Sequence, residues 1–232
     1  MRELLDYFNA LFQENGEMLF TGALDTLYMT FKSTLIAYAI GLPMGILAEV
    51  TRKGGIRPIA AISKILDAII NIGRSIPFII LLVAVMPLTR AIYDTTLGPK
   101  AATVPLIIAA IPFVARLVEN SLKEIDAGVI EAARAMGAND LEIIFKVMIP
   151  ESLPSLVLGA SLATITLVGY TAMAGTIGGG GLGDIAIRYG YHRTEIDIML
   201  ITIVIIVLIV QIIQSVGELT SKMIDKRGKG DN

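Results

Sequence analysis

Few residues in this chain could carry out catalysis or bind a metal. The 232 residues include no cysteine and no tryptophan, and His192 is the single histidine. Thiolate chemistry, disulfides and cysteine-based metal sites are therefore excluded, and a Ser–His–Asp triad or a histidine metal site is hard to build. The glycine-rich stretch 178–183 is not followed by Lys-Ser or Lys-Thr, and no G-x-x-x-x-G-K-[ST] motif occurs elsewhere, so the chain has no visible means of hydrolysing ATP.

The most informative stretch is 126–154, which overlaps the loop at 123–151, and its pattern predicts two short helices. Asp126 can cap the start of the first helix, and Gly137 can end it in the left-handed conformation. Asn139 can cap the second helix, and Glu142, three residues later, completes a capping box. Local signals of this density are typical of a structured loop rather than a flexible connection.

The second half of this segment is expected to pack against the rest of the chain. It carries four large apolar residues at helical spacing: Leu141, Ile144, Phe145 and Met148. Pro150 and Pro154 are expected to mark the turn into the next long helix. Composition alone fits an ordinary amphipathic loop on a bilayer equally well. The net charge of residues 126–149 is −2, which argues against a DNA-binding helix–turn–helix because phosphate would be repelled.

Small residues in the first predicted helix suit a close contact with a partner. Ala132, Ala133 and Gly137 would let the helix backbone approach another surface closely. Glu131 offers a charge for an arginine or lysine on that surface.

The composition is that of an integral membrane protein. Hydrophobic residues make up 54% of the chain and charged residues 17%, with a mean hydropathy of +0.72; a soluble domain is about 45–50% apolar and about 25% charged. The net charge of −2 excludes a strongly basic nucleic-acid-binding protein. We predict an all-α protein with a single transmembrane domain over residues 1–232. Five stretches are long and apolar enough to cross a bilayer: 24–48, 68–92, 101–122, 152–175 and 196–218.

The distribution of basic residues predicts the orientation of these spans. The segment after the first span, the loop at 116–151 and the C-terminal tail together hold 12 lysines and arginines, whereas the opposite side holds 5. Because basic residues concentrate on the cytoplasmic side, the loop and the C-terminus are expected in the cytoplasm and the N-terminus outside.

The N-terminal segment and the odd number of spans lead to two further expectations. Residues 1–15 lack the apolar core and cleavage site of a signal peptide, and five apolar residues instead share one helical face: Leu4, Leu5, Phe8, Leu11 and Phe12. This pattern predicts a short helix at the membrane interface. Five spans cannot divide into two inverted halves, so a symmetric pathway would need a second copy of the chain.

The loop pattern resembles the coupling-loop signature of bacterial ABC-importer permeases. That pattern is Glu131-Ala-Ala, three residues, Gly137, nine residues, and then aliphatic-x-aliphatic-Pro ending at Pro150. Val147 and Ile149 stand where the family prefers isoleucine and leucine, which is a conservative departure. The resemblance continues over most of the chain from residue 26, and three further segments are similar to methionine importers of this family: 71–82, 112–122 and 166–183.

The resemblance implies a membrane-spanning permease that moves methionine, both L and D, by alternating access in the bacterial inner membrane. It implies a homodimer on two cytoplasmic P-loop ATPase subunits, supplied by an extracytoplasmic methionine-binding lipoprotein. The ATPase would bind ATP and Mg, and this chain would hold no cofactor or metal and have no catalytic residues. The docking residues carried over from the family signature are Glu131, Ala132, Ala133 and Gly137.

Three residues within the predicted spans could line a pathway or gate. Arg74 is a charge inside a span, where it should face protein or water. A structural ion pair is favoured over contact with a substrate carboxylate, with three candidate partners: Asp25, Asp67 and Glu119. Tyr170 and Met173 lie among small residues and could line a cavity for a thioether side chain, although methionine more often serves packing.

Other functions remain open on sequence grounds. A permease for another amino acid or a small anion would share every feature except the pocket. An intramembrane aspartyl protease is suggested by two short matches, Tyr93-Asp94 and Gly181-Leu-Gly-Asp184, but both aspartates fall in predicted external loops. A channel without an ATPase has no use for a docking helix. The glycines at 178–183 predict a flexible or tightly turned external loop, with a gate or a docking site for the binding protein as the alternative.

Overall fold

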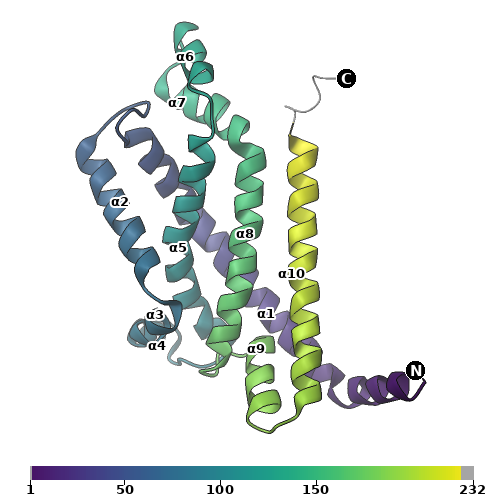
Figure 1. Ribbon diagram of the computed structural model, residues 1–232. Helices are drawn as coiled ribbons and strands as arrows, with labels where there is room; N and C mark the ends of the chain where they lie inside the picture. The colour runs from purple at the N-terminus through teal and green to yellow at the C-terminus, as the bar shows by residue number, and fades with distance from the viewer. Residues whose placement is uncertain (1, 226–232) are drawn as a thin grey trace. The chain divides into compact units, whose positions relative to one another are not determined.

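A computed structural model describes residues 2–225, with side chains from residue 13 onward. Every regular element in this part of the chain is a helix, which confirms the all-α expectation (Figure 1). The elements are α1 (Arg2–Thr51), α2 (Ala60–Ser75), α3 (Phe78–Ala84), α4 (Met86–Tyr93), α5 (Pro99–Lys123), α6 (Ala127–Ala135), α7 (Asp140–Glu142), the π-helix η1 (Ile143–Met148), α8 (Ile149–Gly175), α9 (Gly181–Ile185), the π-helix η2 (Ala186–Tyr191) and α10 (Ile196–Ile224).

Four helical stretches are long and apolar enough to cross a membrane. They are Gln13–Thr51, Pro99–Lys123, Asp140–Gly175 and Ile196–Ile224. The count becomes five if α2 and α3, which are bent by 99° at the break between them, form one span. The third, fourth and fifth expected spans therefore lie within α5, α8 and α10, as the hydropathy predicts.

The second expected span, 68–92, is not a continuous helix. Ile76 ends α2 in the extended conformation, with φ −81° and ψ 121°. The proline ring of Pro77 disfavours the helical conformation in the residue before it, so α2 stops there and the chain turns into α3. The prediction from composition identified the apolar stretch correctly but did not include the break that this proline causes.

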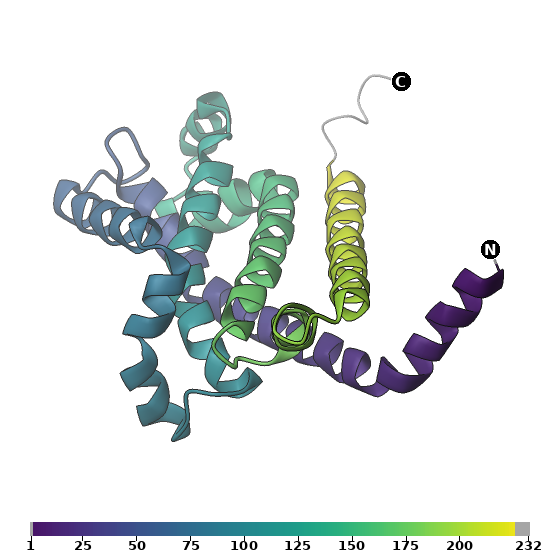
Figure 2. The same ribbon diagram turned by 60° about the horizontal axis from the view of Figure 1, so that its bottom comes forward.

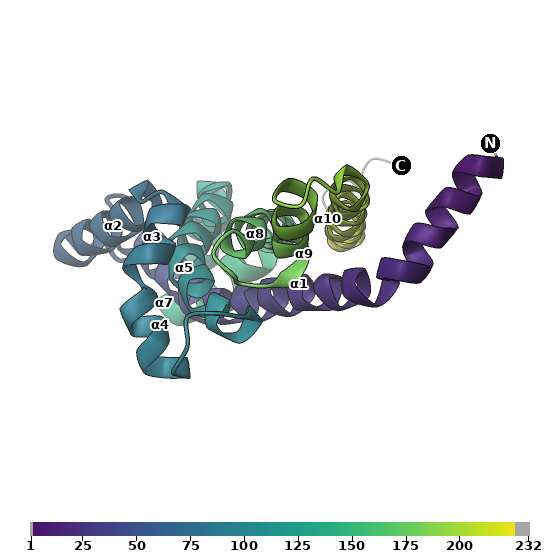
Figure 3. The same cartoon turned by 90° about the horizontal axis from the view of Figure 1, so that it is seen from below.

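The first helix begins much earlier than the first expected span. Residues 2–15 are helical but continuous with the rest of α1, and Figures 2 and 3 show the helix axis changing direction in its N-terminal part. The side chains that suggested an interfacial helix, those of residues 4, 5, 8, 11 and 12, lie outside the described side chains. The location of this segment at a membrane surface stays a prediction.

The described chain divides into two compact units. Unit 1 comprises residues 2–32, 79–106 and 167–211, and its core includes Leu19, Ile185, Ile198 and Ile201. Unit 2 comprises residues 33–78, 107–166 and 212–225, with a core that includes Ala48, Ile70 and Ala115. The four long helices each contribute to both units, and the assignment of residues 1–232 to a single domain stays a prediction.

Small residues permit close helix packing within unit 2. A Cβ placed on Gly41 would lie 2.9 Å from Val114 Cγ1, and one on Gly45 would lie 2.5 Å from the Ala115 carbonyl oxygen. These contacts bring α1 against α5 at the distance that glycine pairs allow in membrane helices.

Candidate functional site

The first predicted helix of the coupling segment forms as α6, with both of its end signals in place. The Asp126 side chain accepts a hydrogen bond from the Gly128 backbone N–H at 2.7 Å, which caps the N-terminus. Gly137 has φ +85°, and the Ala138 N–H donates to the Ala133 carbonyl at 3.1 Å. This is the left-handed glycine termination that the sequence predicts.

The second predicted helix begins at α7 with the expected capping box. The Glu142 N–H donates to Asn139 Oδ1 at 3.0 Å, and the Asn139 N–H donates to Glu142 Oε2 at 3.1 Å. The expected turn at Pro150 and Pro154 is wrong, because the helix runs on through η1 into α8. Both prolines therefore lie within a continuous helical stretch, and each removes one backbone N–H donor from it.

The four apolar residues of this segment do not share one face. Ile144 and Met148 are buried at 9% and 2% exposure, whereas Leu141 and Phe145 are 66% and 64% exposed. A π-helix has more residues per turn than an α-helix, so residues at i and i+4 stay together while the two pairs separate. The expectation that all four hold the segment against the chain is therefore half right.

The carried-over docking residues differ in exposure. Glu131, Ala132 and Gly137 are exposed, whereas Ala133 is buried at 4% exposure and packs within unit 2. Motif reasoning missed two other exposed apolar positions next to them, Val129 and Met136. We call the exposed residues of this segment the α6–η1 surface: Val129, Glu131, Ala132, Met136, Gly137, Leu141 and Phe145.

Helix α6 is joined to the loop that follows α1. The contact is a hydrogen bond from Arg134 Nη2 to the Ile56 carbonyl at 2.5 Å. Near the start of the same loop, Arg52 Nε lies 2.7 Å from both carboxylate oxygens of the buried Glu49. A cavity of about 160 Å³ lies beside these contacts and includes Glu131 in its lining. Figure 1 shows α6 and α7 beyond the end of α5, at one end of unit 2.

The expected ion pairs of Arg74 with Asp67 or Glu119 are wrong, because Arg116 takes both carboxylates. Arg116 Nη1 lies 2.6 Å from Glu119, and Nη2 lies 3.8 Å from Asp67. Nη2 also donates to Asn71 Oδ1 at 2.7 Å, so Arg116 ties α5 to α2. Arg74 is exposed and forms no ion pair among the described residues. Sequence reasoning gave no sign that Arg116, rather than Arg74, would face these groups.

The two candidate pathway residues of α8 lie in unit 1. Tyr170 is half-buried, whereas Met173 is 44% exposed. Because they are three residues apart on one helix, they lie on neighbouring parts of its surface. Their role in a pathway stays a prediction.

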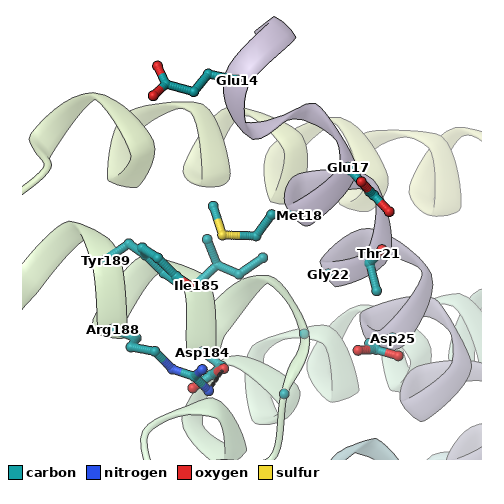
Figure 4. Close-up of a pocket in the computed structure, with 12 residues that line it drawn as sticks. Glu14, Glu17, Met18, Thr21, Gly22, Asp25, Asp184, Ile185, Arg188 and Tyr189 are labelled. Atoms are coloured by element: carbon teal, nitrogen blue, oxygen red, sulfur yellow. Dashed lines mark hydrogen bonds and ion pairs between the residues drawn. The ribbon is translucent and has the colours of Figure 1, made fainter. Parts of the chain in front are cut away.

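A second hollow lies in unit 1 between α1 and the segment formed by α9 and η2. It has a volume of about 460 Å³ and is shown in Figure 4. The lining includes four carboxylates and one arginine: Glu14, Glu17, Asp25, Asp184 and Arg188. The carboxylates come from positions far apart in the sequence, and sequence reasoning did not identify them as a group.

The glycine-rich stretch beside this hollow is tightly turned. The Leu182 N–H donates to the buried Thr26 hydroxyl at 2.9 Å, and Gly180 and Gly181 both have φ +79°. A Cβ on Gly183 would lie 2.3 Å from Ala172 Cα, which leaves no room for a side chain. Of the two forms that the glycines predict, flexible or tightly turned, the structure has the second.

Charged and apolar side chains both line the hollow. Arg188 forms an ion pair with Asp184, and this hydrogen bond raises the pKa of the Arg188 guanidinium. Figure 4 shows Met18 and Ile185 pointing into the space between the helices. An aspartyl protease needs two carboxylates that share a proton, and Asp184 is instead paired with an arginine.

Comparisons with known proteins identify the family. Residues 41–227 match the model of the family described as binding-protein-dependent transport system inner membrane component. The probable D-methionine transport system permease protein MetI of Vibrio cholerae is 47% identical over 93% of this chain and 96% of its own length. The methionine import system permease protein MetP of Bacillus subtilis is 46% identical over 90% of this chain and 94% of its own length.

Solved structures agree with this result. An inward-facing structure of the MetNI methionine ABC transporter matches with a TM-score of 0.90 and 47% identity, covering 92% of this chain and 99% of the solved one. An amino acid ABC transporter solved with histidines matches with a TM-score of 0.77 at 18% identity, which shows a common fold. The chain therefore belongs to the family of binding-protein-dependent transport system inner membrane components.

Proposed function

We propose that this chain is the membrane-spanning permease subunit of an ATP-driven importer that takes up methionine by alternating access. The observation that carries the proposal is the near full-length similarity to methionine permeases, together with an exposed and well-capped α6 at the family's coupling motif. The absence of a P-loop motif in the sequence fits a division of labour in which a separate subunit binds ATP and Mg. No cofactor is proposed for this chain.

The proposed assembly is a homodimer of this chain with two ATPase subunits and an extracytoplasmic methionine-binding lipoprotein. If α2 and α3 form one span, the count is five, and this odd number supports the homodimer, since two copies would supply a symmetric pathway. The excess of basic residues beside the coupling segment supports its location in the cytoplasm, with the C-terminus inside and the N-terminus outside. The family description names an inner-membrane component, and the similar permeases come from bacteria, which supports a location in the bacterial inner membrane.

The α6–η1 surface is the proposed docking site for the ATPase. Ala132 and Gly137 allow a close backbone approach, Glu131 supplies a charge, and Leu141 and Phe145 add apolar area that is unusual on an exposed segment. Ala133, which is buried within unit 2, positions α6 instead of contacting the partner.

Two routes would carry movement of α6 into the spans. Along the chain, α6 packs on η1, and η1 continues without a break into α8. Across the fold, Arg134 holds the loop after α1 through the Ile56 carbonyl. A partner whose ATP-bound state displaces α6 would thus favour one arrangement of α1 and α8 over another, which is the requirement for coupling.

Reconstitution tests this function. The permease, its ATPase and its binding protein are placed in proteoliposomes, and uptake of labelled methionine is measured with and without ATP. We expect uptake that needs ATP and is competed by unlabelled methionine. Efficient competition by a different amino acid or a small anion, with little by methionine, would replace methionine as the substrate. Uptake that proceeds equally without ATP would contradict the importer.

A further inference from the structure

Lys32 carries a positive charge within α1. It lies in the candidate span Gln13–Thr51. Its ammonium donates to the Tyr28 hydroxyl at 2.9 Å and to the Tyr93 hydroxyl at 3.1 Å, and it lies 5.1 Å and 5.6 Å from the centres of the two rings. Both partners are neutral, and Lys32 forms no ion pair among the described residues. A charge in a membrane helix normally has a counter-ion or reaches a polar environment, so this lysine needs an explanation.

The surface around Lys32 is apolar and exposed. Tyr28 is 39% exposed, and three neighbours on α1 are exposed apolar residues: Leu24, Phe31 and Leu35. A hollow of about 550 Å³ also lies against Tyr28, and Leu24, Leu97 and Pro99 supply apolar parts of its lining. An exposed apolar surface on a membrane helix is a surface for lipid acyl chains.

The polar groups at this hollow favour a singly charged anion. Lys100 contributes an ammonium to the lining and Asp25 contributes a carboxylate. Lys32 is not part of the lining, but its ammonium is held next to it by the hydrogen bond to Tyr28. Two lysines and one aspartate leave one positive charge, which matches one phosphodiester. Lys32 has three N–H donors and uses two, and the Tyr28 hydroxyl accepts from Lys32 so that its own O–H can donate. These groups and Lys100 provide charge-assisted donors of the kind that phosphate oxygens accept.

We propose that this hollow of unit 1 binds an anionic phospholipid. Its phosphate lies against Lys32, Tyr28 and Lys100, and one acyl chain lies along Leu24 and Leu97. A lipid is favoured over a soluble anion because the donors border an apolar surface that a soluble ligand would leave uncovered. A lipid with a choline headgroup is disfavoured because its second charge would add to the positive charge already present. The inference requires only that α1 borders lipid, and it does not depend on the transported substrate.

Native mass spectrometry of the detergent-solubilised transporter tests the proposal. The complex is titrated with phosphatidylglycerol and, separately, with phosphatidylcholine. We expect phosphatidylglycerol to be retained preferentially, and the double variant Lys32→Met with Lys100→Met to bind it about a hundredfold more weakly or worse because two charged hydrogen bonds are lost. The matched control is Lys53→Met with Lys64→Met, which removes the same charge from exposed positions in unit 2 and should leave lipid retention unchanged.

The other possible outcomes would each lead to a different conclusion about the lipid site. Equal retention of the two lipids, or an unaffected double variant, would overturn the proposal. Displacement of the lipid by glycerol phosphate at equal concentration would show a soluble-anion site and would also overturn it. Lys100→Met alone keeps the contacts of Lys32 with the two tyrosines, so weakened lipid binding with an unchanged melting temperature in lipid-free detergent separates lost binding from lost folding.

Discussion

Glycine serves opposite purposes in the coupling segment of unit 2 and in the glycine-rich turn of unit 1. Gly137 has open space within 4 Å of the position of a Cβ, and its φ of +85° shows that its role is to terminate α6. Gly183 has no positive φ of this kind, yet a Cβ there would lie 2.3 Å from Ala172 Cα. The space beside Gly137 is therefore open to a partner protein, whereas the space beside Gly183 is occupied by the backbone of the same chain.

The largest expected effect is in the glycine-rich turn. Gly183→Leu should reduce stability strongly because the side chain overlaps backbone atoms, and overpacking of this kind typically costs about 1–3 kcal/mol or more. The measurement is the melting temperature and yield of the purified complex. Gly169→Leu is the matched control, since no heavy atom lies within 4 Å of its Cβ position. Equal melting temperatures for the two variants would show that the turn is looser than the contacts indicate.

Adjacent alanines of α6 should separate docking from folding. Ala132→Trp places a large ring on an exposed position, so we expect a normally folded permease that no longer retains its ATPase during purification. Ala133→Trp should instead lower the melting temperature of the permease, because its site is 4% exposed. Loss of folding by both variants, or retention of the ATPase by both, would remove the distinction between the two sides of α6.

Arg134 tests the link between α6 and the loop after α1. Arg134→Met removes the hydrogen bond to the Ile56 carbonyl, a charge-assisted contact worth about 1.5–3 kcal/mol. We expect methionine uptake to fall several-fold relative to ATP hydrolysis while the complex stays assembled. Lys146→Met removes an exposed ion pair to Glu142 on the same segment and should leave the ratio of uptake to hydrolysis unchanged. A parallel fall of uptake and hydrolysis in Arg134→Met would point to general destabilisation.

The smallest expected effect is at Gly137. Gly137→Ala should cost about 1–2 kcal/mol because an L-residue is strained at a left-handed position. Gly137→Asn should cost less, since asparagine tolerates this conformation better than other residues with a side chain. The measurement is again the melting temperature, with ATPase retention measured in parallel. A larger loss of ATPase retention in Gly137→Asn than in Gly137→Ala would mean that side-chain size at the contact, and not backbone strain, decides the outcome.

Local signals explain why so much of the coupling segment could be predicted from sequence. The caps at Asp126 and Asn139 and the termination at Gly137 depend on hydrogen bonds between residues at most five apart. The long spans depend on hydropathy summed over about 20 residues, which is similarly insensitive to tertiary contacts. These features are present in the structure because contacts with other segments do not override the local preferences that specify them.

The errors and omissions arise where tertiary contacts decide. The break before Pro77 divides an apolar run that hydropathy alone treats as one span. Arg116 captures the carboxylates expected for Arg74, because α5 and α2 meet at that position. The hollow of Figure 4 joins α1 to residues more than 150 positions later, as the bond from Leu182 to Thr26 shows. No local pattern specifies these pairings.

Cysteine cross-linking tests the docking of the coupling segment most directly. The chain contains no cysteine, so Ala132→Cys introduces a unique thiol on the exposed side of α6 and Ala133→Cys a unique thiol on the buried side. The transporter is treated with a short thiol-to-amine cross-linker, and the products are identified by mass spectrometry. We predict a cross-link from position 132 to a P-loop ATPase subunit and little or none from position 133. Normal methionine uptake by Ala132→Cys without any cross-link to the ATPase would contradict the account.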